Sequence, residues 1–250
     1  MDMSFDEELL YQAIFRRKSV RSYSHGPLDS YALEGIVERT KGLRPQVPGI
    51  RTDIRILSGD RVRGMFKVGA PHFLALYSEP GKGYLSNAGF MLQQMDLYFS
   101  VNGIGSCWQG GPKPVREARN VSGLEFVSML AFGPASEVVH RSSPHEFKRE
   151  PLGMISDVDG QERLLEPARL APSGMNNQPW FFTGGDGVVH AHSARSPVAG
   201  RMNLISTGIA LCHMWLAARH QGKDAKVVFE EKGAMSSPAH YSYVASLIMR

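Results

Sequence analysis

The chain has 250 residues, of which 42% are hydrophobic and 21% are charged, and its formal net charge is +4. These values are typical of a globular protein with a sizeable core. The mild charge and the lack of a long Lys/Arg run exclude a nucleic-acid tail. The longest apolar stretch, at about 204–218, is too short and too polar to span a bilayer, so we expect neither a nucleic-acid nor a membrane partner.

Cysteine usage and the first residues of the chain indicate a cytoplasmic protein. Cys107 and Cys212 are far apart, and no C-x-x-C pair or disulfide framework is visible. The first ten residues, MDMSFDEELL, are acidic and lack a signal-peptide pattern. We therefore expect a reducing, cytoplasmic location.

The first part of the chain alternates helices and strands. Residues 4–17 read as a helix, with Ser4 and Glu7 as a capping box. A basic, extended segment follows, and a second helix is expected to start at Asp29 or Ser30 and to stop at Gly42. Farther along, the pattern predicts a buried strand at 72–78, a long apolar helix at 84–105, a strand at 126–133, an irregular polar segment at 140–156 and a helix from about 161.

A weak internal repeat appears when the sequence is shifted by 119 residues. Gly89, Leu92, Met95, Leu97 and Gly103 then coincide with Gly208, Leu211, Met214, Leu216 and Gly222. The pattern predicts a second long helix over 206–222, and the strand at 126–133 has a counterpart at 243–249. The alternative is that two buried helices share these residues by chance. We favour two repeats, at 1–156 and 157–250, in an α+β fold in which a sheet packs with helices around a long central helix.

Two motifs resemble the nitroreductase family of flavoproteins. RRKSVRSY, at 16–23, resembles the family's R-x-S-x-R, and LAPSGMNNQPWFF, at 170–182, resembles its A-P-S-x-x-N-x-Q-P-W-x-F loop. NGIGSCWQGG, at 102–111, and FKREPL, at 147–152, resemble the G-L-G-x-x-W-x-G and R-x-P-L segments. The resemblance covers most of the chain and implies a nitroreductase-like fold.

The order of the motifs departs from the family. There, the A-P-S-x-x-N loop follows the first helical hairpin, where this chain has GLRPQVPGIRTDI at 42–54. The family implies an explanation, because its homodimers bind flavin with one motif from each subunit. The chain resembles a fused, pseudo-twofold branch of the family, of the TM1586 type, in which the second repeat replaces a partner subunit. We expect one composite FMN site per chain, in a monomer that imitates a dimer.

The resemblance assigns roles to residues of both repeats. Arg17, Ser19 and Arg149 would bind the FMN phosphate, with Lys148 nearby. Arg21 would face the pyrimidine edge of the flavin and favour its anionic reduced form. The full set of expected cofactor-binding residues is Arg17, Lys18, Ser19, Arg21, Gly110, Gly111, Arg149, Pro172, Ser173, Gly174 and Asn176. The simpler alternatives are that the basic cluster caps a helix, that Asn176 and Asn177 cap local backbone, and that Trp180 only packs.

The function implied is an FMN-dependent oxidoreductase that transfers a hydride from NAD(P)H to a nitroaromatic, a quinone or a similar small flat acceptor. Gly103 and Gly105 form a lone G-x-G, so a separate Rossmann domain for the nicotinamide is not expected. Nucleophile–base and metal-ligand patterns are not evident, and the chemistry would belong to the flavin. Two alternatives stay open: a flavin store or sensor without turnover, and a flavin-fragmenting or dehalogenating enzyme of the same fold.

Overall fold

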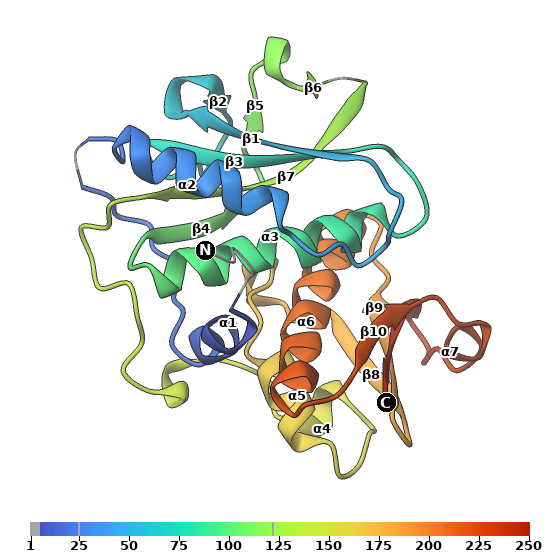
Figure 1. Cartoon of the computed structure of the whole chain (residues 1–250). Coiled ribbons are helices and arrows are strands. Elements are labelled where there is room, and N and C mark those ends of the chain that lie inside the picture. The colour runs from blue at the N-terminus through green and yellow to red at the C-terminus, as the bar shows by residue number, and fades with distance from the viewer. Residues whose placement is uncertain (1–5, 25, 122) are drawn as a thin grey trace.

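Two long buried helices cross at the centre of the molecule. The computed structural model describes residues 6–24, 26–121 and 123–250. Helix α3, Tyr84–Val101, runs beneath a large sheet, and α6, Gly200–His220, approaches it from the other side (Figure 1). Both helices are buried on almost every face, so other elements cover them on all sides. Both expected long helices are confirmed.

Two glycines allow α3 and α6 to approach closely. A Cβ atom on Gly89 of α3 would lie 2.1 Å from the carbonyl oxygen of Ile205, and a Cβ atom on Gly208 of α6 would lie 2.0 Å from that of Ser86. The contacts are reciprocal, because Ile205 lies 119 residues after Ser86 and Gly208 lies 119 residues after Gly89. An exchange of this kind is the contact pattern of a twofold axis.

The first half of the chain forms an antiparallel sheet above α3. Its strand order is β1, β3, β7 and β4, and the short β6 pairs with β7. The bounds are Thr52–Ser58 for β1, His72–Ser78 for β3, Gly105–Gln109 for β4, Asn120–Val121 for β6 and Leu124–Gly133 for β7. Every residue of β3 is buried, as its continuous apolar run predicts, because α3 and α2, Ser30–Lys41, cover one face while β2, Val62–Arg63, and β5, Lys113–Pro114, lie across the other.

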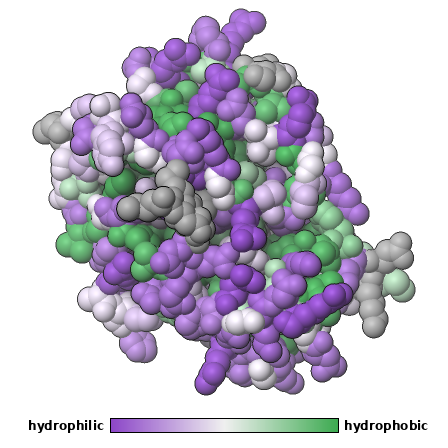
Figure 2. All heavy atoms as spheres, in the orientation of Figure 1, coloured by the Kyte–Doolittle hydropathy of each residue, from purple (hydrophilic) through white to green (hydrophobic). Residues whose placement is uncertain are grey.

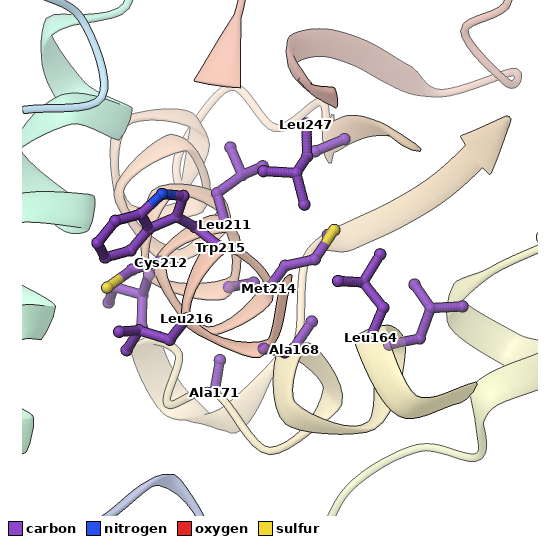
Figure 3. Packing of buried hydrophobic residues seen from close by; sticks show 14 of the residues in the cluster. Leu164, Ala168, Ala171, Leu211, Cys212, Met214, Trp215, Leu216 and Leu247 are labelled. Atoms are coloured by element: carbon purple, nitrogen blue, oxygen red, sulfur yellow. The ribbon is translucent and has the colours of Figure 1, made fainter. Parts of the chain in front are cut away.

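The second half forms a smaller antiparallel sheet of order β10, β11, β9 and β8. The strands span Trp180–Gly185 for β8, Val188–Ala194 for β9, Ala225–Val228 for β10 and Tyr241–Met249 for β11. One face packs on α6 and on α5, Glu162–Arg169. Figure 3 shows this core, in which Met214 of α6 points toward Leu164 of α5, while Trp215 lies on another side of α6. The short helix α7, Glu231–Met235, belongs to this half. Helix α4, Leu152–Ile155, comes from the end of the first half and packs against α5 and β8.

Helix α1, Glu7–Ile14, joins the two halves. Its buried face, formed by Leu10, Ala13 and Ile14, belongs to the same core as α6. The Asp6 carboxylate accepts hydrogen bonds from the N–H groups of Glu8 and Leu9 and caps the helix. Ser4, the expected capping residue, lies outside the described residues, and the cap that the structure describes is Asp6.

The surface is mixed in polarity. Figure 2 shows hydrophobic patches separated by polar side chains on the face that it presents. Among the described residues, no helix is long and apolar enough to cross a membrane, and no three His, Cys, Asp or Glu side chains are grouped as a metal site would need. The two antiparallel sheets and the helices between them confirm the α+β class.

Candidate functional site

The basic segment after α1 runs as an extended chain along the edge of the first sheet. Arg17 and Tyr23 form antiparallel bridges with His140 and Ala135. The N–H of Val20 donates to the carbonyl of Ser106 in β4 at 2.8 Å. Because alternate residues of an extended chain share a side, this conformation puts residues 17, 19 and 21 on one side of the segment.

Arg17 is held inside the protein by the central helix. Its side chain is 2% exposed, and its Nε lies 3.0 Å from Oδ2 of Asp96, a fully buried residue of α3. The Ser106 hydroxyl donates to the other oxygen of Asp96 at 2.6 Å. Nη2 of Arg17 donates to the Ser19 hydroxyl at 3.0 Å. The structure thus brings Arg17 and Ser19 together. It adds Asp96, a buried carboxylate of α3 that the sequence analysis did not single out.

The loop of the second half meets Arg149. Residues Gly174–Asn176 form a 3-10 turn, with Met175 and Asn176 at φ values of 53° and 59°. Nη1 of Arg149 donates to Oδ1 of Asn176 at 2.5 Å, and Nε donates to the carbonyl of Ala171 at 3.0 Å. The Asn176 amide in turn donates to the carbonyl of Lys148 at 2.9 Å. The R-x-P-L and A-P-S-x-x-N segments are therefore bonded to each other.

The guanidiniums of Arg17, Arg141 and Arg149, which we call the arginine cluster, are close enough to affect one another. Burial, and after it the positive charge of Arg17, lowers the pKa of Arg149 to about 9, and Arg141 acts in the same direction. Burial and the charge of Arg17 also lower the pKa of Arg141. All three arginines belong to residues 1–156, and the second-half loop reaches their positive charge through Asn176, which accepts from Arg149. Sequence reasoning missed Arg141 because it stands in the irregular segment, outside the motifs.

The side chain of Lys18 and the backbone of Arg21 both contact the carboxylate of Glu137. Nζ of Lys18 lies 2.9 Å from Oε2 of Glu137, and the backbone N–H of Arg21 donates to Oε1 at 2.7 Å. The Arg21 N–H and the Lys18 ammonium lower the pKa of Glu137 to about 2. Lys18 is therefore part of a surface ion pair and not of the arginine cluster. The Arg21 side chain is exposed, and its charge opposes the rise that burial causes in the pKa of Cys107.

Glycines from the two halves meet at one methionine. A Cβ atom on Gly110, just after β4, would lie 3.4 Å from Sδ of Met202, and a Cβ atom on Gly174 would lie 2.2 Å from the same sulfur. A side chain at Gly174 would therefore have to displace the end of the Met202 side chain. A Cβ atom on Gly111 would lie 3.3 Å from the Met65 carbonyl. The two glycine segments expected to contact the flavin are thus near each other.

The rest of the second-half loop is fixed locally. The Ser173 hydroxyl accepts from the N–H of Gln178 at 2.9 Å, and the N–H of Gly174 donates to the Ser206 hydroxyl of α6 at 3.3 Å. Pro172 is buried, and Trp180 is fully buried in the core of the second half. The packing role expected for Trp180 is confirmed.

A series of hydrogen bonds between side chains connects β4, the strand before Gly110, to the two central helices. The Trp108 indole N–H donates to Oε1 of Gln93 at 3.1 Å, and Nε2 of Gln93 lies 2.9 Å from Nε2 of His213. Burial lowers the pKa of His213 to about 3, so the ring is neutral at pH 7. Nδ1 of His213 lies 2.8 Å from the Pro167 carbonyl and is assigned the proton, so Nε2 accepts from Gln93. These hydrogen bonds hold β4 against α3 and α6.

Comparison with known proteins agrees with the motifs. A scan against protein-family profiles matches residues 9–218 to the family described as "Putative TM nitroreductase". The chain belongs to this nitroreductase family. The matched range contains both the basic segment and the second-half loop, so one family pattern spans both halves of the candidate site.

Solved structures show the same fold. A "putative nitroreductase" of Thermotoga maritima has 20% sequence identity and a TM-score of 0.66, and the match covers 96% of this chain and 93% of that one. This likeness confirms the nitroreductase fold. A nitroreductase family protein of Clostridium difficile has 17% identity and a TM-score of 0.45 over 58% of this chain and 94% of its own. A nitroreductase of Desulfitobacterium hafniense with bound FMN has 14% identity and a TM-score of 0.41 over 57% of this chain and 98% of its own. The search of curated proteins finds no match.

Proposed function

We propose that this nitroreductase-family protein binds FMN and transfers a hydride from NAD(P)H to a nitroaromatic, a quinone or a similar small flat acceptor. One observation carries the proposal. Arg149, whose pKa is lowered by burial and then by the charge of Arg17, is hydrogen-bonded to Asn176. Groups from the N-terminal motif and from the late loop therefore lie in one cationic site, as a composite cofactor site requires.

The residues present fit the phosphate of FMN. Charge-assisted hydrogen bonds to an anion are each worth about 1.5–3 kcal/mol. Arg17, Ser19 and Arg149 would supply two guanidinium groups and a hydroxyl. Among the described residues, the only ion pair that involves either arginine is that between Arg17 and Asp96. Phosphate would therefore relieve charge crowding as well as accept hydrogen bonds.

The ring and the ribityl chain would be held by residues of both halves. Pro172, Ser173, Gly174 and Asn176 would line one side. Gly110 and Gly111 would let backbone N–H groups approach the flavin. The exposed guanidinium of Arg21 would favour negative charge at the pyrimidine edge. When bound, FMN supplies the hydride chemistry, and the chain provides binding, orientation and electrostatic support.

The chain would work as a pseudo-dimer folded in one piece. Residues 1–156 would contribute the phosphate ligands, and residues 157–250 would contribute the loop that a partner subunit supplies elsewhere in the family. The reciprocal contacts of Gly89 and Gly208 support this division, because they relate the halves by the 119-residue offset seen in the sequence.

Steady-state kinetics tests the proposed activity. Purified protein would be freed of flavin, reconstituted with FMN and mixed with NADH or NADPH and a quinone. We expect oxidation of the nicotinamide that depends on both FMN and the quinone. FMN binding without such oxidation would instead favour a flavin store or sensor, and it would refute the proposed enzyme activity. Cytoplasmic location, proposed from the two unpaired cysteines, can be checked by cell fractionation.

A further inference from the structure

Arg141 stands beside the expected phosphate ligands without belonging to either motif. Its backbone N–H donates to the carbonyl of Arg16 at 2.8 Å, and its Nη1 donates to the carbonyl of Arg17. Its Cζ lies 4.0 Å from the centroid of the Phe147 ring, and Cζ of Arg149 lies 5.5 Å from the same centroid. The buried Phe147 thus supports two guanidiniums at once.

The positive charges of Arg141 and Arg149 are not balanced by nearby carboxylates in the described part of the chain. Within the described residues, neither Arg141 nor Arg149 forms an ion pair with a carboxylate. Glu146 is near enough to raise the pKa of Arg141, but burial and Arg17 lower that pKa more strongly. The Glu146 carboxylate instead accepts from the N–H and the hydroxyl of Ser142. Two half-buried guanidiniums that lack a counter-ion are costly, and an anion between them would remove much of that cost.

We infer that Arg141 is a third phosphate ligand and that the arginine cluster selects a phosphomonoester dianion. Arg17, Arg141 and Arg149 carry three positive charges, and Asp96 cancels one of them. The remaining two charges match a phosphomonoester, which carries about −1.5 to −2 at pH 7. The inference rests on the proposed function and adds Arg141 to the groups that would bind the phosphate of FMN. Riboflavin has no phosphate, and each phosphate of FAD carries one ester and one anhydride linkage and a single charge.

Binding of FMN and riboflavin separates the phosphate contribution from general effects on the site. Flavin-free protein would be titrated with each flavin while the flavin fluorescence is followed. The ratio of the two dissociation constants measures how much the phosphate adds. A structural defect weakens both flavins, whereas loss of a phosphate ligand weakens FMN alone.

Arg141→Gln keeps a hydrogen-bonding side chain and removes the charge. We expect the preference for FMN over riboflavin to fall by about tenfold or more, as loss of one charge-assisted bond implies. Arg44→Gln is the matched control, because Cζ of Arg44 also lies against an aromatic ring, 5.6 Å from the centroid of Trp215, but outside the cluster. The control variant should prefer FMN over riboflavin as strongly as the wild type does.

The titrations distinguish a failure of the proposed function from a failure of the role assigned to Arg141. If wild-type protein binds neither flavin, the proposed function and this inference both fail. If it binds FMN and folded Arg141→Gln keeps the wild-type preference, only the role of Arg141 fails. Should Arg141→Gln not fold, Arg141→Lys retains the charge without the planar fork, and we expect its preference to fall by about threefold or more. An unchanged preference in the folded lysine variant would overturn the assignment.

Discussion

The contact between the central helices makes a sharp prediction about Gly89. A Cβ atom there would lie 2.1 Å from the Ile205 carbonyl oxygen, whereas ordinary contact begins at 3.4 Å, so α3 and α6 would have to separate by about 1.3 Å at this point. The obstacle is backbone, which cannot rotate away as a side chain can. Gly89→Ala therefore forces both helices to move.

The size of the effect follows from two opposing contributions. Replacing glycine with alanine inside a helix is worth about 1 kcal/mol in favour of folding. Overpacking a core typically costs about 1–3 kcal/mol, and occasionally more, and here the separation also loosens the packing on both sides of the crossing. We expect Gly89→Ala to lower the free energy of unfolding by about 2 kcal/mol net, which is the upper typical cost of overpacking less the gain from alanine. Gly208→Ala should do the same, because its contact is reciprocal to that of Gly89.

Urea unfolding followed by circular dichroism measures the change. Gly35→Ala is the control, because it lies in α2 with nothing within 4 Å of the added Cβ, and it should stabilise the protein by up to about 1 kcal/mol. The double variant of Gly89 and Gly208 should cost less than the sum of the single changes, since one separation relieves both clashes. A Gly89→Ala protein as stable as the wild type would refute the close crossing.

Three further predictions concern the site. Asn176→Ala removes the acceptor of Arg149, so FMN should raise the melting temperature of this variant less than that of the wild type; an equal shift would argue against the composite site. Asp96→Asn leaves the buried Arg17 without its counter-ion, and the flavin-free protein should lose about 3–5 kcal/mol in chemical unfolding; a loss below about 1 kcal/mol would mean that the pair is unimportant. Because the pKa of Arg149 is about 9 without ligand, raising the pH through 9 removes its charge, and the affinity for FMN should fall there while that for riboflavin does not. A constant ratio of the two affinities between pH 8 and 10 would contradict a charge role for Arg149.

Regular elements were predictable from the sequence because their patterns are local. The apolar run of residues 72–78 and the two helices with glycines at a common offset appear where expected. Asp29 caps α2, which ends before Gly42, as the turn residues indicate. These features depend on residues within a few positions of one another, so a single sequence is enough to read them.

The arrangement of the site depended on contacts that no local pattern contains. The pairing of Arg17 with Asp96 joins an extended segment to the middle of a helix, and Arg141 reaches the cluster from an irregular segment. Lys18 has the right position in its motif, yet it pairs with Glu137, which only the fold brings beside it. Motif register therefore identified the segments of the site, and tertiary packing determined which of their side chains meet.

The two halves differ at the place that corresponds to Gly110. The residue 119 positions after Gly110 is Phe229, and the residue 119 positions before Met202 is Gly83. A Cβ atom on Gly83 would lie 2.5 Å from Cζ of Phe229. Where a glycine meets a methionine in the candidate flavin site, a glycine meets an aromatic ring at the related place, so the two halves are not equivalent there.

The stoichiometry of FMN binding tests the composite site most directly. Flavin-free wild-type protein at a concentration well above the dissociation constant would be titrated with FMN, and the break in flavin fluorescence would give the number of sites. We predict one FMN per chain, because one basic segment and one A-P-S-x-x-N loop form a single site. Two FMN per chain, or none, would contradict the account.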